Sequence, residues 1–282
     1  MNVIRKEIIY LFIFFTACLW GCDSLSLDEK VDEYPVIIER LTISDLQVLN
    51  QQYHEKNNNL ICSTLNEYGF TGYSRVLFPD NVNPCLSRSE LKQEIPFSND
   101  LLYLAKEVLK ENAEYTGVEV IESLVLEDVT SLNGCTICEG DINSVPLQWK
   151  FTFQLQVIND IEVMDSEILV YMDKNGVNRI WGNWFPVTDP GFVEFGSVAA
   201  KEKALGMKVR YANSKNQIFE QEIAQEHLSG EPELKFVPIE IEERLEIHKA
   251  WVFNVLQENT QEVRWNVFIS TVTGDVLKVK LL

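Results

Sequence analysis

Residues 147–157 alternate apolar and polar side chains without a break. The apolar members are Leu147, Trp149, Phe151, Phe153, Leu155 and Val157. Because successive side chains of a strand point to opposite faces, this period of two predicts a strand with one buried and one solvated face. A second strand at 168–172 and the turn-forming residues 173–176 predict an antiparallel sheet around it. Nothing in this stretch indicates catalysis.

Helices and further strands are predicted on both sides of this stretch. Residues 101–109 carry one apolar stripe, with Ser98 or Asn99 as the capping residue, and predict a helix that ends before Gly117. Residues 197–205 predict a shorter helix. Further strands are expected at 118–129, 234–241, 245–256, 263–269 and 276–282, while residues 216–228 fit a helix or an edge element. The predicted fold class is α+β, with antiparallel sheets each packed by one or two helices, in two similar modules in tandem.

The expected domain boundaries follow changes in composition. Pro186, Pro190 and Gly191 mark the best boundary between the two modules. The predicted segments are a signal peptide at 1–21, an acidic tether at 22–33, a small N-terminal region at 34–96, a first module at 97–190 and a second at 191–282. Within 34–96 we expect a helix around 41–53, a short helix at 60–65 and a strand at 72–78.

The N-terminus indicates export. Arg5 and Lys6 precede an apolar run at 8–20, which is shorter than the ~20 residues of a membrane-spanning helix and typical of a signal peptide. Residues 19–22, Leu-Trp-Gly-Cys, resemble a bacterial lipobox, which implies cleavage before Cys22 and lipidation of that cysteine. An ordinary secretory signal or an uncleaved anchor are the alternatives. We therefore expect a lipid-anchored protein of the bacterial cell envelope, at the outer membrane or cell surface, on its periplasmic or external face.

The net charge of −19 disfavours some partners. A chain this acidic has no electrostatic reason to bind nucleic acid or an anionic lipid surface. Solubility is the simplest explanation of the charge, so contact with the membrane is expected through the lipid anchor only.

Four cysteines remain once Cys18 leaves with the signal and Cys22 is lipidated: Cys62, Cys85, Cys135 and Cys138. An even number in an exported protein predicts disulfides, and proximity in sequence favours Cys62–Cys85 with Cys135–Cys138. The Cys135-x-x-Cys138 spacing also occurs in redox centres, but there it begins a helix, whereas here it lies between two strands. A zinc site needs four ligands, and the three histidines do not complete one.

Trp181 and Trp184 stand three residues apart beside prolines. They fit a ligand-binding platform or, more commonly, a core at a module junction. They are the only candidate ligand contacts in the sequence. No catalytic motif and no metal or cofactor site is predicted.

At two places the chain resembles a known family. The block 145–186, with its Asp173–Gly176 turn and the Ile180–Asn183 closing strand, resembles the propeptide module of fungalysin and thermolysin precursors. Residues 249–253, 264–269 and 273–277 are similar to a PepSY domain, with Asp275 where glutamate is commoner. The two likenesses together cover about residues 97–282, in the order that these modules take in pro-regions of metallopeptidases.

The resemblance implies a non-enzymatic pro-region, which in that family assists folding of the peptidase and blocks its cleft. The zinc motif of the peptidase, His-Glu-x-x-His, is not present, since His54-Glu55 is followed by Asn58 at the second histidine position. We therefore expect a standalone module that binds or inhibits an exported metallopeptidase or another envelope protein. The alternatives are a cell-surface protein that binds a small ligand or polymer on the same scaffold, and a redox enzyme using Cys135 and Cys138.

Overall fold

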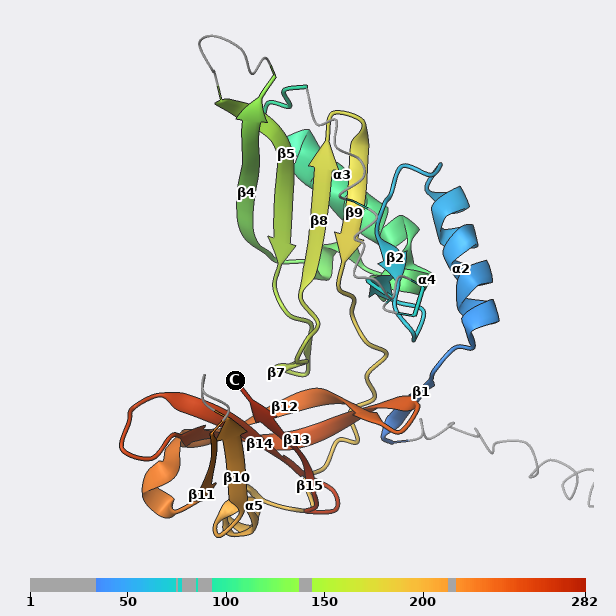
Figure 1. Ribbon diagram of the computed structural model, residues 1–282. Helices are drawn as coiled ribbons and strands as arrows, with labels where there is room; N and C mark the ends of the chain where they lie inside the picture. Colours follow the sequence, from blue (N-terminus) through green and yellow to red (C-terminus); the bar gives the residue numbers. More distant parts are fainter. Residues whose placement is uncertain (1–33, 75, 78–84, 86–92, 137–143, 213–216) are drawn as a thin grey trace, which may run out of the picture. The chain divides into compact units, whose positions relative to one another are not determined.

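A computed structural model describes residues 34–282, except for 75, 78–84, 86–92, 137–143 and 213–216. Its two larger sheets are antiparallel, and each packs against a helix (Figure 1). The predicted α+β class with two similar helix-and-sheet modules is confirmed. Contacts between residues group Tyr34–Leu282 into one unit.

The first sheet has four strands in the order β4-β5-β8-β9. These strands are β4 (Leu126–Cys135), β5 (Ser144–Phe153), β8 (Ile168–Asp173) and β9 (Gly176–Trp181). The predicted turn at 173–176 is confirmed, with the backbone N–H of Asn175 donating to Asp173 Oδ1 at 2.7 Å. Gly176 takes a φ of +115°, which a side chain would disfavour.

Strand β5 ends earlier than the alternation predicts, at Phe153 instead of Val157. The chain turns away because the Gln156 backbone N–H donates to Ser166 Oγ at 2.8 Å, and the Gln156 side chain bonds the backbone of Phe185. Residues Val157–Ile158 (β6) instead pair with Ile161–Glu162 (β7) in a small hairpin. Buried hydrogen-bonding groups of one glutamine thus override the apolar pattern.

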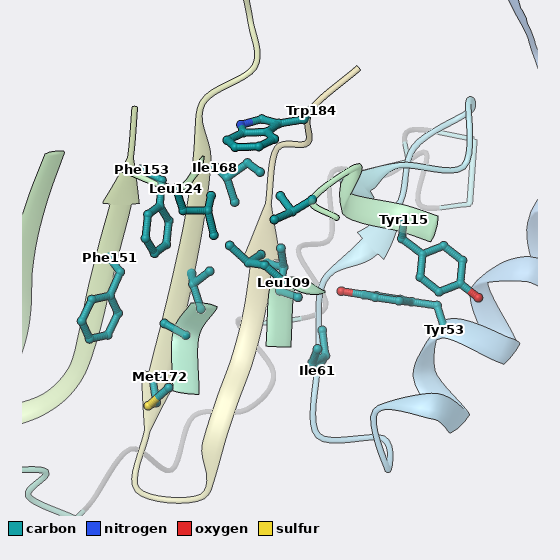
Figure 2. Packing of buried hydrophobic residues seen from close by; sticks show 14 of the residues in the cluster. Tyr53, Ile61, Leu109, Tyr115, Leu124, Phe151, Phe153, Ile168, Met172 and Trp184 are labelled. Carbon is teal, nitrogen blue, oxygen red and sulfur yellow. The ribbon is translucent and has the colours of Figure 1, made fainter. Parts of the chain in front are cut away.

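Helix α3 (Asn99–Glu111) packs on one face of this sheet. Leu109 meets Phe151, Phe153 and Ile168 in a core whose side chains are fully buried (Figure 2). The helix confirms the prediction, although Ser98 makes no capping bond through its side chain. Two short elements, α4 (Ala113–Thr116) and the 3₁₀ turn η1 (Ile121–Ser123), lead from α3 into β4.

Strand β4 differs from its prediction at both ends. We expected a strand at 118–129, and both of its boundaries are wrong, because β4 runs from Leu126 to Cys135. The 3₁₀ turn occupies part of the expected range, and the ladder with β5 continues to Cys135, which pairs with Ser144.

Residues 34–96 add strand β1 to the second sheet and pack against the first core. Helix α2 (Ile43–Lys56) is capped by Thr42, whose Oγ1 accepts from the Asp45 backbone N–H at 3.2 Å, and it buries Tyr53 against Tyr115 of the first core (Figure 2). The helix predicted at 60–65 is wrong, because Cys62 N–H donates to Asn178 O at 2.7 Å, which ties this segment to the edge of β9. Thr64–Leu65 (β2) pairs with Thr71–Gly72 (β3), which is shorter than the strand predicted at 72–78.

The second sheet is built around a long central strand, β13 (Arg244–Leu256). Its partners are β12 (Leu228–Ile241), β14 (Val263–Ser270), which also pairs with β15 (Val276–Leu281), and β1 (Val36–Glu39). Strand β1 pairs with the first four residues of β13, from Ile247 back to Arg244, and β14 pairs with Ala250 to Leu256. The sequence predicted the C-terminal strands but not the addition of β1.

Helix α5 (Ser197–Ala204) packs on one face of the second sheet, with Ala200 and Ala204 against Phe253 and Val255. A hairpin of β10 (Lys208–Ala212) and β11 (Ile218–Glu222) joins this cluster, and the 3₁₀ turn η2 (Gln225–His227) follows. Of the alternatives left open for 216–228, the edge element is therefore correct.

An apolar junction cluster joins segments that are distant in sequence. Its buried members are Val163, Phe185, Phe236, Leu245 and Ile247. Beside it, Met164 N–H donates to Phe236 O at 2.8 Å, and Lys249 Nζ lies 2.8 Å from Asp189 Oδ1. Both side chains of the Lys249–Asp189 ion pair are largely buried, at 6% and 12% exposed.

Candidate functional site

The face of the first sheet that points away from α3 carries the alternate residues of its four strands. We call these residues the open face: Asp128, Thr130 and Leu132 of β4, Gln148, Lys150 and Thr152 of β5, Leu169 and Tyr171 of β8, and Arg179 and Trp181 of β9. Their neighbours Phe151, Val170 and Ile180 point into the core beneath α3. Figure 1 shows the four strands in front of α3, so the reader looks onto the open face.

Arg179 reaches the open face because of a β-bulge in β9. The turn pairs Met172 with Val177, but the next pair is Tyr171 with Arg179, so Asn178 is the extra residue. Without the bulge, Arg179 would pair with Val170 and point into the core, since a shift of one residue exchanges the two faces. Asn178 is held by its side chain, which donates to Asp173 Oδ2 at 2.7 Å.

One row across the sheet is basic and aromatic. Lys150 pairs with Tyr171, and Tyr171 pairs with Arg179. The Arg179 guanidinium carbon lies 4.6 Å from the centre of the Tyr171 ring, a cation–π contact worth ~0.5–2 kcal/mol. Arg179 Nε is buried and makes no hydrogen bond within the described part of the chain.

The adjacent row is largely apolar. Thr152 pairs with Leu169, and Leu169 pairs with Trp181, whose side chain is 44% exposed. Thr152 is buried beneath its neighbours, and its Oγ1 has no hydrogen-bond partner among the described residues. Gln148 is also buried, and its Nε2 donates to Asn178 Oδ1 at 3.0 Å. The alternation of residues 147–157 had predicted that Gln148 and Thr152 face water, which is wrong, because both are buried at 6% exposure.

The cations of the open face lack anionic partners. Elsewhere, Arg210 pairs with Glu220 at 2.6 Å and Arg244 with Glu246 at 2.7 Å. Within the described residues, neither Lys150 nor Arg179 forms an ion pair. Both cations of the open face therefore lack an ion pair within the described residues, although the chain has 43 acidic and only 24 basic residues.

The structure separates the two tryptophans proposed as ligand contacts. Trp181 lies on the open face, where its role as a contact remains a prediction. Trp184 is 9% exposed and packs in the first core, so it cannot contact a ligand at the surface (Figure 2). The sequence analysis did not identify three further residues of this face as candidate contacts: Lys150, Tyr171 and Arg179. The alternation of side chains along β5 and β8 would have placed Lys150 and Tyr171 on one face of the sheet.

The predicted disulfide Cys62–Cys85 is confirmed. Cys135 is also disulfide-bonded, but Cys138 lies outside the described residues, so their pairing remains a prediction. Cys135 is the last residue of β4 instead of preceding a helix, which does not suit a thioredoxin-like centre. Cys22, the expected lipidation site, also lies outside the described residues.

The histidines take part in local hydrogen bonds. His54 Nε2 lies 2.9 Å from Ser63 O, and His248 Nε2 lies 2.8 Å from Glu246 Oε2. His227 Nδ1 accepts from the Ala224 backbone N–H at 3.0 Å. Within the described ranges, no group of three or more histidine, cysteine, aspartate or glutamate residues is placed to hold a metal ion.

Two small hollows lie away from the open face. One, of about 250 Å³, lies between α2, α3 and the β8–β9 turn and is lined by Leu60, Leu104 and Met172 among others. The other, of about 310 Å³, is lined by residues that include Arg40 and Glu243. These volumes fall near the lower limit of small-molecule sites, ~300–1,000 Å³.

The comparisons with known proteins identify no family. No family model matches the chain, and no curated protein matches it. A solved structure, the C-terminal domain of YpeB from Bacillus megaterium, matches over 67% of each chain with 16% identity and a TM-score of 0.30. A likeness at this TM-score supports no conclusion about function. In the parts of the chain that the structure describes, no helix is long and apolar enough to cross a membrane.

Proposed function

We propose that the protein is a non-enzymatic, lipid-anchored protein of the bacterial cell envelope that binds and restrains an exported peptidase through the open face. The observation that carries the proposal is the grouping of Trp181, Tyr171 and Arg179 on one uncovered face of the first sheet. Tryptophan, tyrosine and arginine are the residue types that dominate the binding energy of protein interfaces.

The form of the surface favours a protein partner over a small molecule. Small-molecule sites are concave, whereas the open face is the side of a sheet. Arg179 and Tyr171 are already in contact, so little side-chain entropy is lost when a partner binds them.

The class of partner is supported by the resemblance of block 145–186 to propeptide modules. The matching turn at 173–176 and the strand that follows it both belong to the sheet that carries the open face. Lipidation at Cys22 would attach this sheet to the envelope through the acidic tether at 23–33, where exported peptidases pass.

The test is a binding and inhibition assay with the mature, lipidated chain and the metallopeptidases that its own host secretes. We expect one of them to bind the protein and to cleave its substrate more slowly. Trp181→Ala should weaken binding by about 30-fold, because loss of a central interface tryptophan costs ~2 kcal/mol or more. Val198→Ala is the matched control, because Val198 is 75% exposed on α5, outside the open face. Absence of binding to every secreted peptidase, or an equal loss with both variants, would contradict the proposal.

A second candidate function is binding of a surface polymer, which the exposed ring of Trp181 favours. Aromatic rings at protein surfaces offer a flat apolar contact for sugar rings. Quenching or enhancement of tryptophan fluorescence by envelope polysaccharides, lost in Trp181→Phe, would support this candidate over the peptidase.

A further inference from the structure

Arg179 is held in a conformation that leaves its terminal amino groups free. The guanidinium lies over the Tyr171 ring at 4.6 Å, and Nε is buried. The Nη groups make no hydrogen bond within the described part of the chain. A guanidinium fixed in this way presents two parallel N–H donors, an arrangement that matches the two oxygens of a carboxylate.

Lys150 adds a second positive charge from β5, the strand on the other side of β8 from Arg179. It pairs across the strands with Tyr171 and forms no ion pair with the described carboxylates. The acidic side chains nearest to Lys150 in the sheet form no ion pair with it among the described residues. Asp128 belongs to the neighbouring row and forms no ion pair among the described residues, and Asp173 is hydrogen-bonded to Asn175 and Asn178.

The apolar row lies beside the charged one. Trp181 and Leu169 are two residues from Arg179 and Tyr171 along their strands, a spacing of ~6.6 Å. An extended protein segment carries same-side residues i and i+2 at this same spacing. A carboxylate at i and an apolar side chain at i+2 would therefore meet Arg179 and Trp181 together.

We infer that the open face recognises an acidic protein segment, in which an aspartate or glutamate carboxylate binds Arg179 and Lys150 and an apolar residue two positions away packs on Trp181. This inference rests on the proposed function and adds the chemistry of the partner. The charge balance supports it, because the two cations have no anion of their own in a strongly acidic chain. The carboxylate of the partner supplies the missing countercharge.

The first experiment uses the full mature chain and the peptidase that it binds. Arg179→Glu should weaken binding by about 30-fold or more, because the partner's carboxylate then faces a like charge. Arg179→Lys should recover only part of the affinity, because lysine keeps the charge but loses the two-pronged geometry. Lys203→Glu, an exposed cation on α5, is the control and should leave affinity unchanged.

A second experiment uses peptides as probes, so that the two proposals can fail separately. The full chain is titrated with a synthetic Thr-Glu-Thr-Leu-Thr peptide and with its Gln counterpart, and Trp181 fluorescence is followed against Trp181→Phe. We expect the Glu peptide to bind at least about tenfold more tightly, an advantage that falls as salt rises from 50 to 500 mM.

The outcomes separate the inference from the proposed function. Selective binding of the Glu peptide without any peptidase partner would keep the carboxylate site and overturn the peptidase. Peptidase binding that is lost in Trp181→Ala but unaffected by salt and by Arg179→Glu would overturn the carboxylate site alone. Tighter binding of polygalacturonate than of the Glu peptide would overturn the protein segment as the occupant.

Discussion

The two sheets of this protein differ in how deeply their two faces are buried. Strand β13 at the centre of the second sheet is buried on both sides, with Phe253 and Val255 in one cluster and Ala250 and Val252 in another. Strand β8 of the first sheet alternates strictly between buried residues and the half-buried Leu169 and Tyr171. The second sheet therefore has the pattern of a scaffold, and the first has the pattern of a sheet that presents a surface.

Charge follows the same division. In β13, Glu246 is buried and pairs with Arg244 at 2.7 Å and with His248 at 2.8 Å, and Lys249 pairs with Asp189. On the open face, Lys150 and Arg179 have no such partners among the described residues. The buried charges of the second sheet are thus compensated inside the chain, whereas the two half-buried cations of the open face form no ion pair among the described residues.

The largest expected effect comes from the buried face of the second sheet. Phe253→Ala removes a side chain that is 3% exposed, and should lower the free energy of unfolding by about 3–5 kcal/mol through lost burial and the resulting cavity. Urea unfolding measures this value. A decrease in the free energy of unfolding below about 1 kcal/mol would contradict the view that the second sheet is the structural scaffold.

A smaller effect is expected from the ion pair beside the junction cluster. Asp189→Asn leaves the buried ammonium of Lys249 without its counterion and should cost about 3 kcal/mol at neutral pH. Burial raises the pKa of Asp189, but hydrogen bonds from Lys249 and Asn159 outweigh it and hold the pKa below the ordinary 3.8.

The pH dependence of that variant gives a further test. Because the folded pKa of Asp189 is depressed, its contribution is complete above the ordinary pKa and is lost as the pH falls through the folded value. The stability difference between the natural protein and Asp189→Asn should therefore be constant near neutrality and shrink below about pH 4. A constant difference down to pH 2 would contradict the assignment.

Substitutions on the open face should weaken partner binding more than they lower stability. Tyr171→Ala removes the ring beneath Arg179 and should change the free energy of unfolding by less than about 1 kcal/mol, while weakening partner binding about tenfold. Tyr171→Phe keeps the ring and should bind normally. Unfolding and affinity measured on the same samples would separate the two effects, and a loss of stability equal to that of Phe253→Ala would remove the contrast between the sheets.

The smallest effect on stability is expected for Trp181→Ala. The ring is 44% exposed, so its removal should change the free energy of unfolding by about 0.5 kcal/mol or less. Thermal unfolding with and without the bound peptidase provides the measurement. The partner should stabilise the natural protein and leave the variant unaffected.

Local patterns in the sequence were sufficient to predict core residues but not the residues of the candidate site. The alternation around Phe151 and Phe153 placed both residues correctly, because burial on one face is recorded in a period of two. The position of Arg179 depends on the bulge at Asn178, and a bulge reverses the faces without changing the composition of the strand. The burial of Thr152 depends on side chains from adjacent strands, which a single strand does not reveal.

Distance along the chain limited the prediction elsewhere. The segment at 60–65 was expected to be helical from its composition, but hydrogen bonds to β9, more than a hundred residues later, keep it extended. Lipidation, domain boundaries and the nature of the partner remain predictions.

The pairing of β1 with β13 has a consequence for how the protein is made. Val36 lies opposite Ile247, so the first described strand can pair only after residues more than 200 positions later have been synthesised. Contacts this remote carry a large loop-closure entropy and slow folding. The second sheet therefore cannot be completed until its C-terminal strands have been synthesised and released from the ribosome, so its assembly is a late step of folding.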